Sequence, residues 1–430
     1  MQLIKVPFGR GKEACFIPDN VQLTYACLKQ IEPEQETKDY ITDALDNLVG
    51  DLNWDKLKTA KSIAIAVSDI TRPVPSKIIL EQLLLWLGKH GLPDDRIVVL
   101  VGGGLHRPAN SGDLKYIFGE QLLNQISNIV AHDADDQNML TYLGYSSMGT
   151  PIFVNKHFAQ ADFKIVTGMV DAHQFMGFTA GVKGAVIGLG GRFTITGNHA
   201  HLFDSGAQLG RIEGNPARRD IEDIGHIIGV DMIVNVVLND KKQVINAVAG
   251  DPVLAHRKAV EFAKSVFGVE VATSDIVIAS PGGFPKDINL YQAQKALTPA
   301  TQIVKEGGTI ILAAECLEGT GEETFEEEMD KYESAAHVLD SFRKKAFEIG
   351  PHKAYLWART LAKATVIIVS PNISLSLAKI LKVEAIPSLQ NAVDNAIKQN
   401  TNTTLAILPY ASSLIPLSKN ITWGYKVSEE

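Results

Sequence analysis

The feature that most constrains the fold is a regular alternation of short β-branched runs with amphipathic helical stretches. Residues 62–69 (SIAIAVSD) predict a buried strand, and residues 77–91 (KIILEQLLLWLGKHG) predict the helix that follows it. Further strands are predicted at 96–104, 163–170, 231–239, 275–283, 307–315, 364–370 and 403–409. Continuous apolar strands separated by helices indicate parallel sheets that are covered on both faces. We therefore predict an α/β fold with two Rossmann-like domains and mainly parallel sheets.

The domain organisation follows from the length of the chain and from a restart of this pattern. A chain of 430 residues is too long for one ordinary core. The pattern begins again after a helix expected near residues 252–266. We predict an N-terminal α/β domain over 1–270 and a C-terminal α/β domain over 275–412. We expect a tail, 413–430, to pack back on the N-terminal domain.

Composition excludes several classes of protein. Apolar residues make up 45% of the chain and charged residues 21%, as in soluble globular proteins. The formal net charge is −8, and the sequence contains no basic stretch interleaved with aromatic residues. We therefore do not expect the protein to bind nucleic acid. We expect neither a signal peptide nor a membrane span from the sequence. The three cysteines, Cys15, Cys27 and Cys316, are too widely spaced to indicate a disulfide framework or a Cys-x-x-Cys metal site. We expect a cytoplasmic protein, and the oligomeric state stays open.

Unusual polar residues gather directly after predicted strands. SDITRPVP (68–75), GGGLHRP (102–108), DAHQFMGF (171–178) and SPGGFPKD (280–287) each follow a strand. Ligands of open α/β sheets bind outside the carboxyl ends of the strands. We therefore predict that these loops, from both domains, line one interdomain active-site cleft, which the C-terminal domain closes.

The first three of these loops contain one candidate anion-binding residue and two candidate acid/base residues. Arg72 supplies a fork for a carboxylate or phosphate, although Asp69 and Arg72 could equally form a local ion pair. His106 and His173 stand at two strand ends, where they could face one substrate from opposite sides. That arrangement suits a racemase or epimerase; the plainer alternative is that they bond only to backbone.

Four other segments hold candidate residues whose individual signals are weak. Lys183 lies in a glycine-rich run and could bind phosphate, form a covalent adduct or reach solvent. His199 and His201 form a His-x-His pair, which on a strand would share one face and could supply a metal ligand. Tyr291, Gln292 and Lys295 fall on a predicted helix over 290–304, and Trp357 taken alone is typical of a core residue.

Taken together, these stretches resemble the nickel-dependent lactate racemase family over essentially the whole chain. SDITRPVP, GGGLHRP, DAHQFMGF with GVK (181–183), NHAH (198–201) and LYQAQK (290–295) occur in the order and spacing of that family. The resemblance implies a nickel-pincer nucleotide, which is a pyridinium-3,5-bisthiocarboxylic acid mononucleotide that holds nickel and joins a lysine through a thioamide.

The resemblance also implies a role for each candidate residue. Lys183 corresponds to the attachment lysine and His199 to the nickel ligand, while the role of His201 stays open. His106 and His173 correspond to the catalytic acid/base pair. The residues that correspond to substrate-binding positions are Arg72, Asp69, Tyr291, Gln292, Lys295 and Trp357.

The implied reaction is inversion of a 2-hydroxy acid by reversible hydride transfer. Departures from the lactate enzymes at Ala172, Ala180 and Ile187 remove no reactive group, and the sequence leaves the particular 2-hydroxy acid open. The expected partners are this small substrate and the enzymes that assemble the cofactor. Two alternatives remain: a nucleotide-dependent 2-hydroxyacid dehydrogenase, and a non-catalytic anion- or nucleotide-binding protein on the same scaffold.

Overall fold

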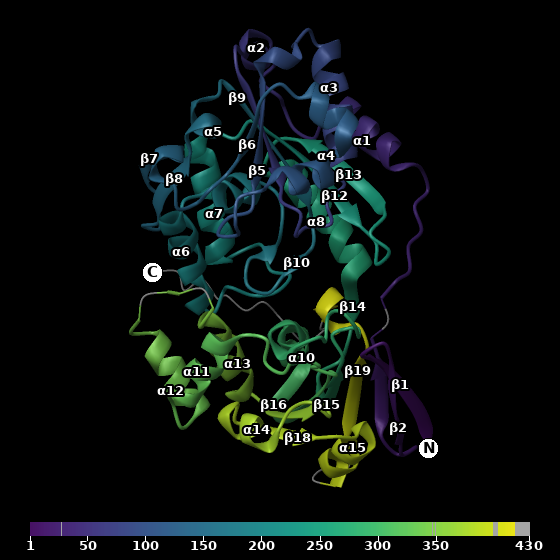
Figure 1. Ribbon diagram of the computed structural model, residues 1–430. Helices are drawn as coiled ribbons and strands as arrows, with labels where there is room; N and C mark the ends of the chain where they lie inside the picture. The colour runs from purple at the N-terminus through teal and green to yellow at the C-terminus, as the bar shows by residue number, and fades with distance from the viewer. Residues whose placement is uncertain (27, 346, 349, 399–402, 418–430) are drawn as a thin grey trace, which may run out of the picture. The chain divides into compact units, whose positions relative to one another are not determined.

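The structure is a computed structural model that describes residues 1–417 except 27, 346, 349 and 399–402 (Figure 1). The chain divides into two compact units. One comprises residues 30–266 and is called here the N-terminal unit. The other comprises residues 1–29 and 267–430 and is called the C-terminal unit. No described helix is both long enough and apolar enough to cross a lipid bilayer.

The N-terminal unit is built on a six-stranded sheet with the order β13-β12-β9-β4-β5-β6. All neighbouring strands are parallel except the β12–β13 pair. The strands are β4 (Ile63–Ser68), β5 (Ile97–Gly102), β6 (Ile129–Ala131), β9 (Phe163–Met169), β12 (Met232–Leu238) and β13 (Val244–Gly250). Most of their residues are buried, because a sheet covered on both faces needs apolar side chains on both faces.

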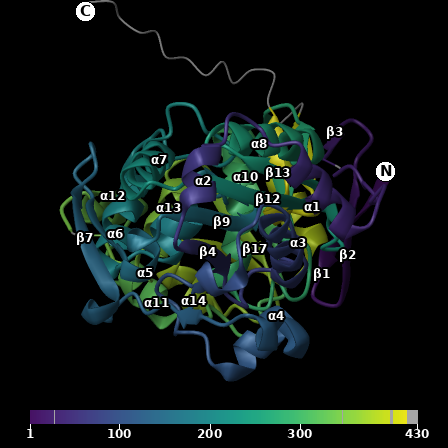
Figure 2. The same cartoon turned by 90° about the horizontal axis from the view of Figure 1, so that it is seen from above.

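The two faces of this sheet have different coverings. Helices α1 (Thr37–Asp46), α3 (Ser76–Lys89) and α4 (Ser111–Gln125) share a core with alternate residues of β4 and β5. Seen from above, α1 and α3 lie side by side (Figure 2). One turn of π-helix, η3 (Gly184–Gly188), contacts β4, β5 and β9. Lys183 is the residue directly before that turn. The contacts of the turn with the sheet therefore fix the position of the Lys183 backbone.

The remaining elements of the N-terminal unit are shorter. The helices are α2 (Trp54–Thr59), α5 (Lys156–Gln160), α6 (Arg192–Ala200), α7 (Pro216–Ile228) and α8 (Leu254–Phe267). Two antiparallel pairs join β7 (Leu140–Tyr145) to β8 (Pro151–Asn155) and β10 (Ala172–His173) to β11 (Gly177–Phe178).

The C-terminal unit contains a second six-stranded sheet, which is parallel throughout, with the order β18-β17-β16-β15-β19-β3. Its strands are β3 (Gln22–Tyr25), β15 (Ser274–Ala279), β16 (Val304–Ala313), β17 (Thr365–Val369), β18 (Glu384–Ile386) and β19 (Thr404–Leu408). The helices are α9 (Leu290–Ala293), α10 (Leu297–Ile303), α11 (Glu323–Asp330), α12 (Ala335–Phe342), α13 (His352–Leu361), α14 (Leu375–Ile380) and α15 (Leu389–Lys398). The mainly parallel α/β fold is thus confirmed, and each predicted strand is found within four residues of its expected ends.

The division of the chain differs from the predicted one at the N-terminus. The units separate between Val266 and Phe267, close to the predicted joint, but residues 1–29 belong to the C-terminal unit. Strand β3 pairs with β19, and the hairpin of β1 (Gln2–Phe8) and β2 (Gly11–Ile17) shares a core with α15. The compact unit over 30–266 and the predicted N-terminal domain over 1–270 therefore differ chiefly in residues 1–29.

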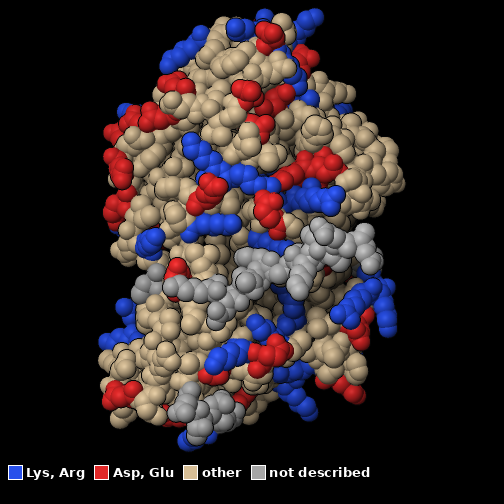
Figure 3. Space-filling view, turned by 180° about the vertical axis from the view of Figure 1, so that it is seen from behind, with Lys and Arg blue, Asp and Glu red and all other residues tan. Residues whose placement is uncertain are grey.

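The predicted tail over 413–430 lies mostly outside the described residues. Its described part includes β20 (Ile415–Leu417), which pairs in parallel with β14 (Gly268–Glu270). Figure 3 shows Lys and Arg side chains mixed with Asp and Glu side chains across one face of the molecule.

Candidate active site

His106 and Asp69 form a hydrogen-bonded pair at the carboxyl ends of two neighbouring strands. Strands β4 and β5 pair in parallel up to Ser68 and Gly102, so the loops that follow them start side by side. The Nδ1 atom of His106 lies 2.7 Å from Oδ2 of Asp69. A Cβ atom on Gly103 would lie 3.1 Å from the same carboxylate oxygen, so glycine leaves room for this approach.

The bond to Asp69 orients the imidazole of His106 for proton transfer. A carboxylate can only accept a hydrogen bond, so the Nδ1 atom must carry a proton and the Nε2 atom is left as the base. Burial alone would raise the pKa of Asp69, but hydrogen bonds from His106 and Thr71 and the nearby charges of His106 and Arg72 lower it. Asp69 therefore stays ionised and holds the ring in one tautomer.

Arg72 follows Asp69 in the same loop and its side chain is exposed. The backbone N–H of Arg72 donates to the carbonyl of Asp69 at 3.3 Å. The hydrogen bonds to the Asp69 carboxylate come instead from His106 and, at 2.8 Å, from Thr71 Oγ1. The alternative of a local Asp69–Arg72 ion pair is therefore not the bonding found, and the guanidinium is left available for an anion.

His173 has the opposite hydrogen-bonding pattern. It lies on the short strand β10, where its Nδ1 atom accepts from the backbone N–H of Met176 at 3.2 Å. A neutral ring whose Nδ1 atom accepts must carry its proton on Nε2. The ring also packs edge-on against Phe175, with centroids 4.7 Å apart. His106 thus presents a base at Nε2 and His173 presents a donor at Nε2.

Lys183 is presented by a left-handed turn and has an unusual protonation balance. Ala180 and Gly181 have φ values of +62° and +61°. A Cβ atom on Gly184 would lie 2.6 Å from Val166 Cγ1, so the chain after the lysine lies directly on the sheet. Burial, followed by the charges of Arg72 and Arg218, lowers the pKa of Lys183 to about 7. A substantial fraction of its amine is therefore an unprotonated nucleophile at neutral pH.

His199 and His201 lie on helical structure, so the assumption that they share a strand face is wrong. His199 is in the last turn of α6, and His201 begins a 3₁₀ turn. Residues two apart on a helix point in widely different directions. Burial, followed by the charge of Lys183, lowers the pKa of His199 to about 3, so its imidazole is neutral, which is the form that binds metals.

His201 points instead toward a buried carboxylate. Its Nε2 atom lies 3.5 Å from Oδ2 of Asp220. The Asp220 carboxylate accepts hydrogen bonds from Ser146 at Oδ1 and from Thr150 and Asn198 at Oδ2. Among the described residues, no group of three or more His, Cys, Asp or Glu side chains is placed to hold a metal ion. His199 and His201 therefore do not define a metal centre built from protein ligands alone.

Four predicted residues lie in the C-terminal unit. Tyr291 and Gln292 are on α9, and Lys295 is on the 3₁₀ turn that continues it, with Lys295 Nζ 2.7 Å from Gln292 Oε1. Trp357 on α13 is 1% exposed, and its Nε1–H donates to the carbonyl of Leu381 at 2.9 Å. Its burial agrees with the expectation of a core residue.

Sequence reasoning missed two buried cations near the predicted residues. Arg218 on α7 bonds to the turn before Lys183, and Lys353 on α13 places its Nζ atom 4.9 Å from the centroid of the Tyr291 ring. The run PARRDIEDIGH (216–226) contains so many charges that it resembles a solvated helix face. Only the pairing of an arginine with Glu222 four residues later could have suggested an ion pair there.

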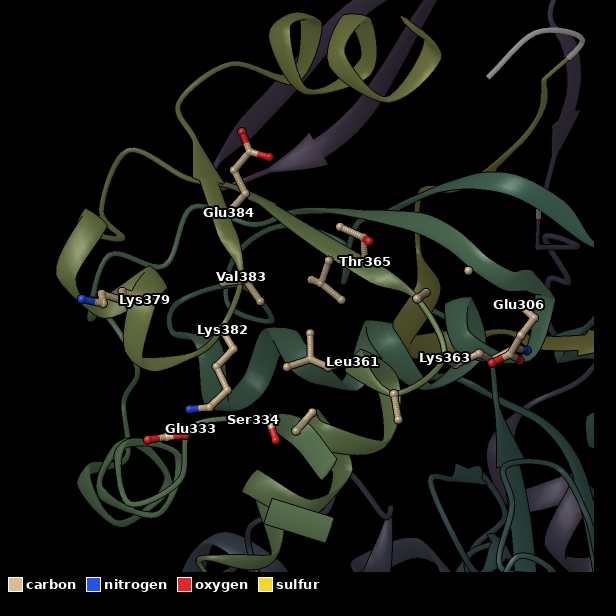
Figure 4. Close-up of a pocket in the computed structure, with 15 residues that line it drawn as sticks. Glu306, Glu333, Ser334, Leu361, Lys363, Thr365, Lys379, Lys382, Val383 and Glu384 are labelled. Atoms are coloured by element: carbon tan, nitrogen blue, oxygen red, sulfur yellow. The ribbon is translucent and has the colours of Figure 1, made fainter. Parts of the chain in front are cut away.

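A hollow in the C-terminal unit is separate from these residues. It has a volume of about 840 Å³ and lies where β17 and β18 begin, which is the opposite edge of the sheet from the strands' carboxyl ends (Figure 4). Two of its three lysines bond to backbone: Lys382 Nζ donates to the carbonyls of Met329 and Ile380, and Lys363 Nζ donates to that of Thr301. None of the predicted site residues lines it.

The fold and these residues define a class of protein: a two-unit α/β enzyme with an Asp-supported histidine, a second histidine and a lysine of lowered pKa in one unit. The family profile of the lactate racemase N-terminal domain matches residues 8–210, and that of the lactate racemase C-terminal domain matches residues 269–415. The chain belongs to the lactate racemase family and is an isomerase of the racemase class.

Individual relatives agree with this assignment. A lactate racemase of Lactiplantibacillus plantarum is 34% identical over 369 residues, which cover 84% of this chain and 86% of the relative. A lactate racemase of Thermoanaerobacterium thermosaccharolyticum is 30% identical over 97% of this chain and all of the relative. The solved structure of the apoprotein from that organism matches with a TM-score of 0.87 at 29% identity, covering 97% of this chain and 100% of that one. A Thermotoga maritima protein (TM-score 0.62, 16% identity, 91% of this chain and 100% of that one) shares the fold.

Proposed function

We propose that this protein inverts the configuration of a 2-hydroxy acid, with lactate as the first candidate, and that it does so with a nickel-pincer nucleotide joined to Lys183. The observation that carries the proposal is the complementary state of His106 and His173. One ring is held by Asp69 with its Nε2 atom as a base, and the other is held by backbone with its Nε2 atom as a donor. Inversion needs both functions, because the two enantiomers present their hydroxyl groups differently.

The donor atoms of the N-terminal unit fit such a cofactor. An unprotonated lysine amine can form an amide-type bond, and a neutral imidazole can bind nickel. The charge of Lys183 is one of the causes that lower the pKa of His199, which supports their lying near each other. When bound, the nickel-pincer group would supply a hydride acceptor and donor, while the protein supplies position and charge. Lys183 would hold the group and His199 would bind its nickel.

The protein's own residues would then carry the substrate and its proton. Arg72 would bind the carboxylate through its guanidinium fork, which fixes the position of carbon 2. The Nε2 atom of His106 would accept the hydroxyl proton, and the ionised Asp69 would stabilise the positive ring that results. The Nε2–H group of His173 would donate to the substrate oxygen. For Tyr291, Gln292, Lys295 and Trp357 the family resemblance implies substrate binding, and this assignment stays a prediction.

The test compares protein produced with and without the cofactor-assembly enzymes. We expect a covalent adduct on Lys183, found by peptide mass spectrometry, and stereoinversion only in the loaded protein. Nickel alone should not restore activity to unloaded protein. Lys183→Ala should lose both adduct and inversion, while His90→Gln, a histidine outside the site, should keep both. Full inversion by Lys183→Ala would contradict the proposal.

The same preparations distinguish the other functions and identify the substrate. A panel of chiral 2-hydroxy acids, lactate included, is assayed for inversion in heavy water. Return of the same hydride leaves carbon 2 unlabelled, whereas inversion through a carbanion would introduce deuterium there. Net oxidation with stoichiometric NAD would instead indicate a dehydrogenase, and tight binding without turnover in loaded protein would indicate a binding protein.

A further inference from the structure

The segment that presents Lys183 is seated on a buried arginine that none of the predicted roles includes. We propose that Arg218 is a positioning residue for Lys183, and that its guanidinium holds the Thr179–Gly181 turn in the shape that aims the lysine amine at the group to be attached. This inference rests on the proposed function, because it assumes that Lys183 is the attachment site. It concerns only the N-terminal unit.

Direct hydrogen bonds join the guanidinium to this turn. Arg218 is 1% exposed, and its Nη1 atom donates to the carbonyl of Ala180 at 3.2 Å. Its Nη2 atom lies 2.7 Å from Nδ1 and 3.0 Å from Nε2 of His256, and that Nε2 atom lies 2.8 Å from the carbonyl oxygen of Thr179. Burial, followed by the charges of Arg218 and Arg257, lowers the pKa of His256 well below its usual value. The neutral ring therefore accepts from Arg218 and donates to Thr179.

The turn needs such support because its backbone is strained. Ala180 has a φ of +62°, a region that residues with a Cβ atom rarely adopt and that persists only where the surroundings enforce it. The next residue, Gly181, donates its N–H to Oδ1 of Asn235 at 2.9 Å. A Cβ atom on Gly181 would lie 2.4 Å from Nη2 of Arg218, so the backbone rests directly against the guanidinium.

The charge of Arg218 acts in the same direction as its geometry. Arg218 shares the carboxylate of Glu222 with Arg257, whose two Nη atoms contact the two carboxylate oxygens at 2.6 and 2.9 Å. Arg257 also pairs with the exposed Glu213, whose Oε1 atom lies 3.3 Å from its Nε atom. The positive charge of Arg218 is one of the causes that lower the pKa of Lys183, after burial and Arg72. The same side chain thus shapes the turn and favours the unprotonated amine.

Attachment is a condensation without oxidation or reduction. The Nζ–C bond forms at the thiocarboxyl carbon, the carbon–oxygen bond breaks and the sulfur is retained. One proton from the amine and one from the acid leave with that oxygen as water. The amine must reach the carbon without a proton, so both the position of the turn and its positive surroundings affect the rate.

Arg257 offers a matched control because it also binds Glu222 but, within the described part of the chain, forms no hydrogen bond with the Thr179–Gly181 turn; its side chain is 28% exposed. Arg218→Met, Arg218→Lys and Arg257→Met are produced with the cofactor-assembly enzymes, and the adduct on Lys183 is followed by mass spectrometry over time. We expect roughly tenfold or greater slowing for Arg218→Met, since a charged hydrogen bond of this kind is lost. We expect partial rescue by Arg218→Lys and near wild-type attachment for Arg257→Met. Hydrogen exchange should quicken in the peptide over 179–183 for Arg218→Met.

The outcomes separate the two levels of the argument. No adduct on Lys183 in the wild-type protein would overturn the proposed function. A wild-type adduct with equally fast attachment in Arg218→Met would overturn this inference alone, as would equal losses in Arg218→Met and Arg257→Met. If Arg218→Met does not fold, the test rests on Arg218→Lys. Attachment and hydrogen exchange that are both unchanged from wild type in this variant would contradict the proposal that the guanidinium of Arg218 holds the turn.

Discussion

Replacement of Asp69 by asparagine tests the assignment of His106 as the base. The substitution keeps the size of the side chain but removes the negative charge that faces His106 Nδ1 at 2.7 Å. If the amide oxygen still faces the ring, the tautomer is kept and only the charge is lost. If the amide nitrogen faces the ring instead, the proton moves to Nε2 and the base is lost.

The magnitude follows from the strength and exposure of this bond. A hydrogen bond to a charged partner contributes about 1.5–3 kcal/mol. The side chain of His106 is 48% exposed, which places the charge effect near the lower value. That value corresponds to about tenfold in rate. Loss of the base would cost about a hundredfold or more. We therefore expect kcat/KM to fall by about 10- to 100-fold.

The assay measures stereoinversion by loaded protein with the best 2-hydroxy acid of the panel, after the adduct on Lys183 has been quantified. Thr71→Val is the matched control, because it removes only the neutral donor to Asp69 Oδ1 at 2.8 Å. We expect it to lower kcat/KM less than about threefold, since water can replace an exposed hydroxyl. The reasoning would be refuted if Asp69→Asn kept wild-type kcat/KM while His106→Gln was inactive.

Two further predictions concern stability. Gly181→Ala forces a Cβ atom to 2.4 Å from Arg218 at a φ of +61°, so urea unfolding should show a loss of about 2–4 kcal/mol, part of which Arg218→Met should recover. The pKa of Asp275 is lowered from 3.8 to about 2, because hydrogen bonds from Thr404 and the charge of Lys305 outweigh burial. The folded-state pKa is the lower one, so its contribution of at most about 2 kcal/mol is complete above pH 4 and disappears toward pH 2. The difference in unfolding free energy between wild type and Asp275→Asn should shrink over that range; a difference that is constant with pH would contradict the assignment.

The two sheets could be predicted from sequence because their strands are buried on both faces. In β4 and β5 the first five residues are all buried, so each appears in the sequence as an unbroken apolar run that ends at a polar residue or at glycine. Strand β3 gives no such signal, because its burial is mixed and its partner β19 is far away in the sequence. The assignment of residues 1–29 to the C-terminal unit depends on that pairing, so it could not be predicted from the local sequence alone.

The candidate site was predictable in its residues but not in its bonds. Asp69 and Arg72 are close in sequence, which suggested an ion pair between them. Because β4 and β5 are neighbours in the sheet, the Asp69 carboxylate instead hydrogen-bonds with His106. The run RFTIT (192–196) contains β-branched residues typical of a strand, yet it forms α6, where the Thr194 hydroxyl donates to the carbonyl of Pro151. Tertiary packing here overrides a weak local preference for strand. As a result, His199 and His201 do not share the strand face that we expected.

The unequal states of the two histidines raise a question that thermodynamics answers. Enantiomers have equal free energies, so the equilibrium constant of a racemase is one, and kcat/KM must be the same in both directions for every variant. The asymmetry between an Asp69-held ring and a backbone-held ring therefore cannot favour one enantiomer in kcat/KM. It can only divide the same ratio differently between kcat and KM. Asp69→Asn should lower kcat/KM equally for both enantiomers while kcat falls more in the direction that starts with proton transfer to His106. Equal changes in kcat in both directions would mean that the two rings exchange their hydrogen-bonding states during turnover.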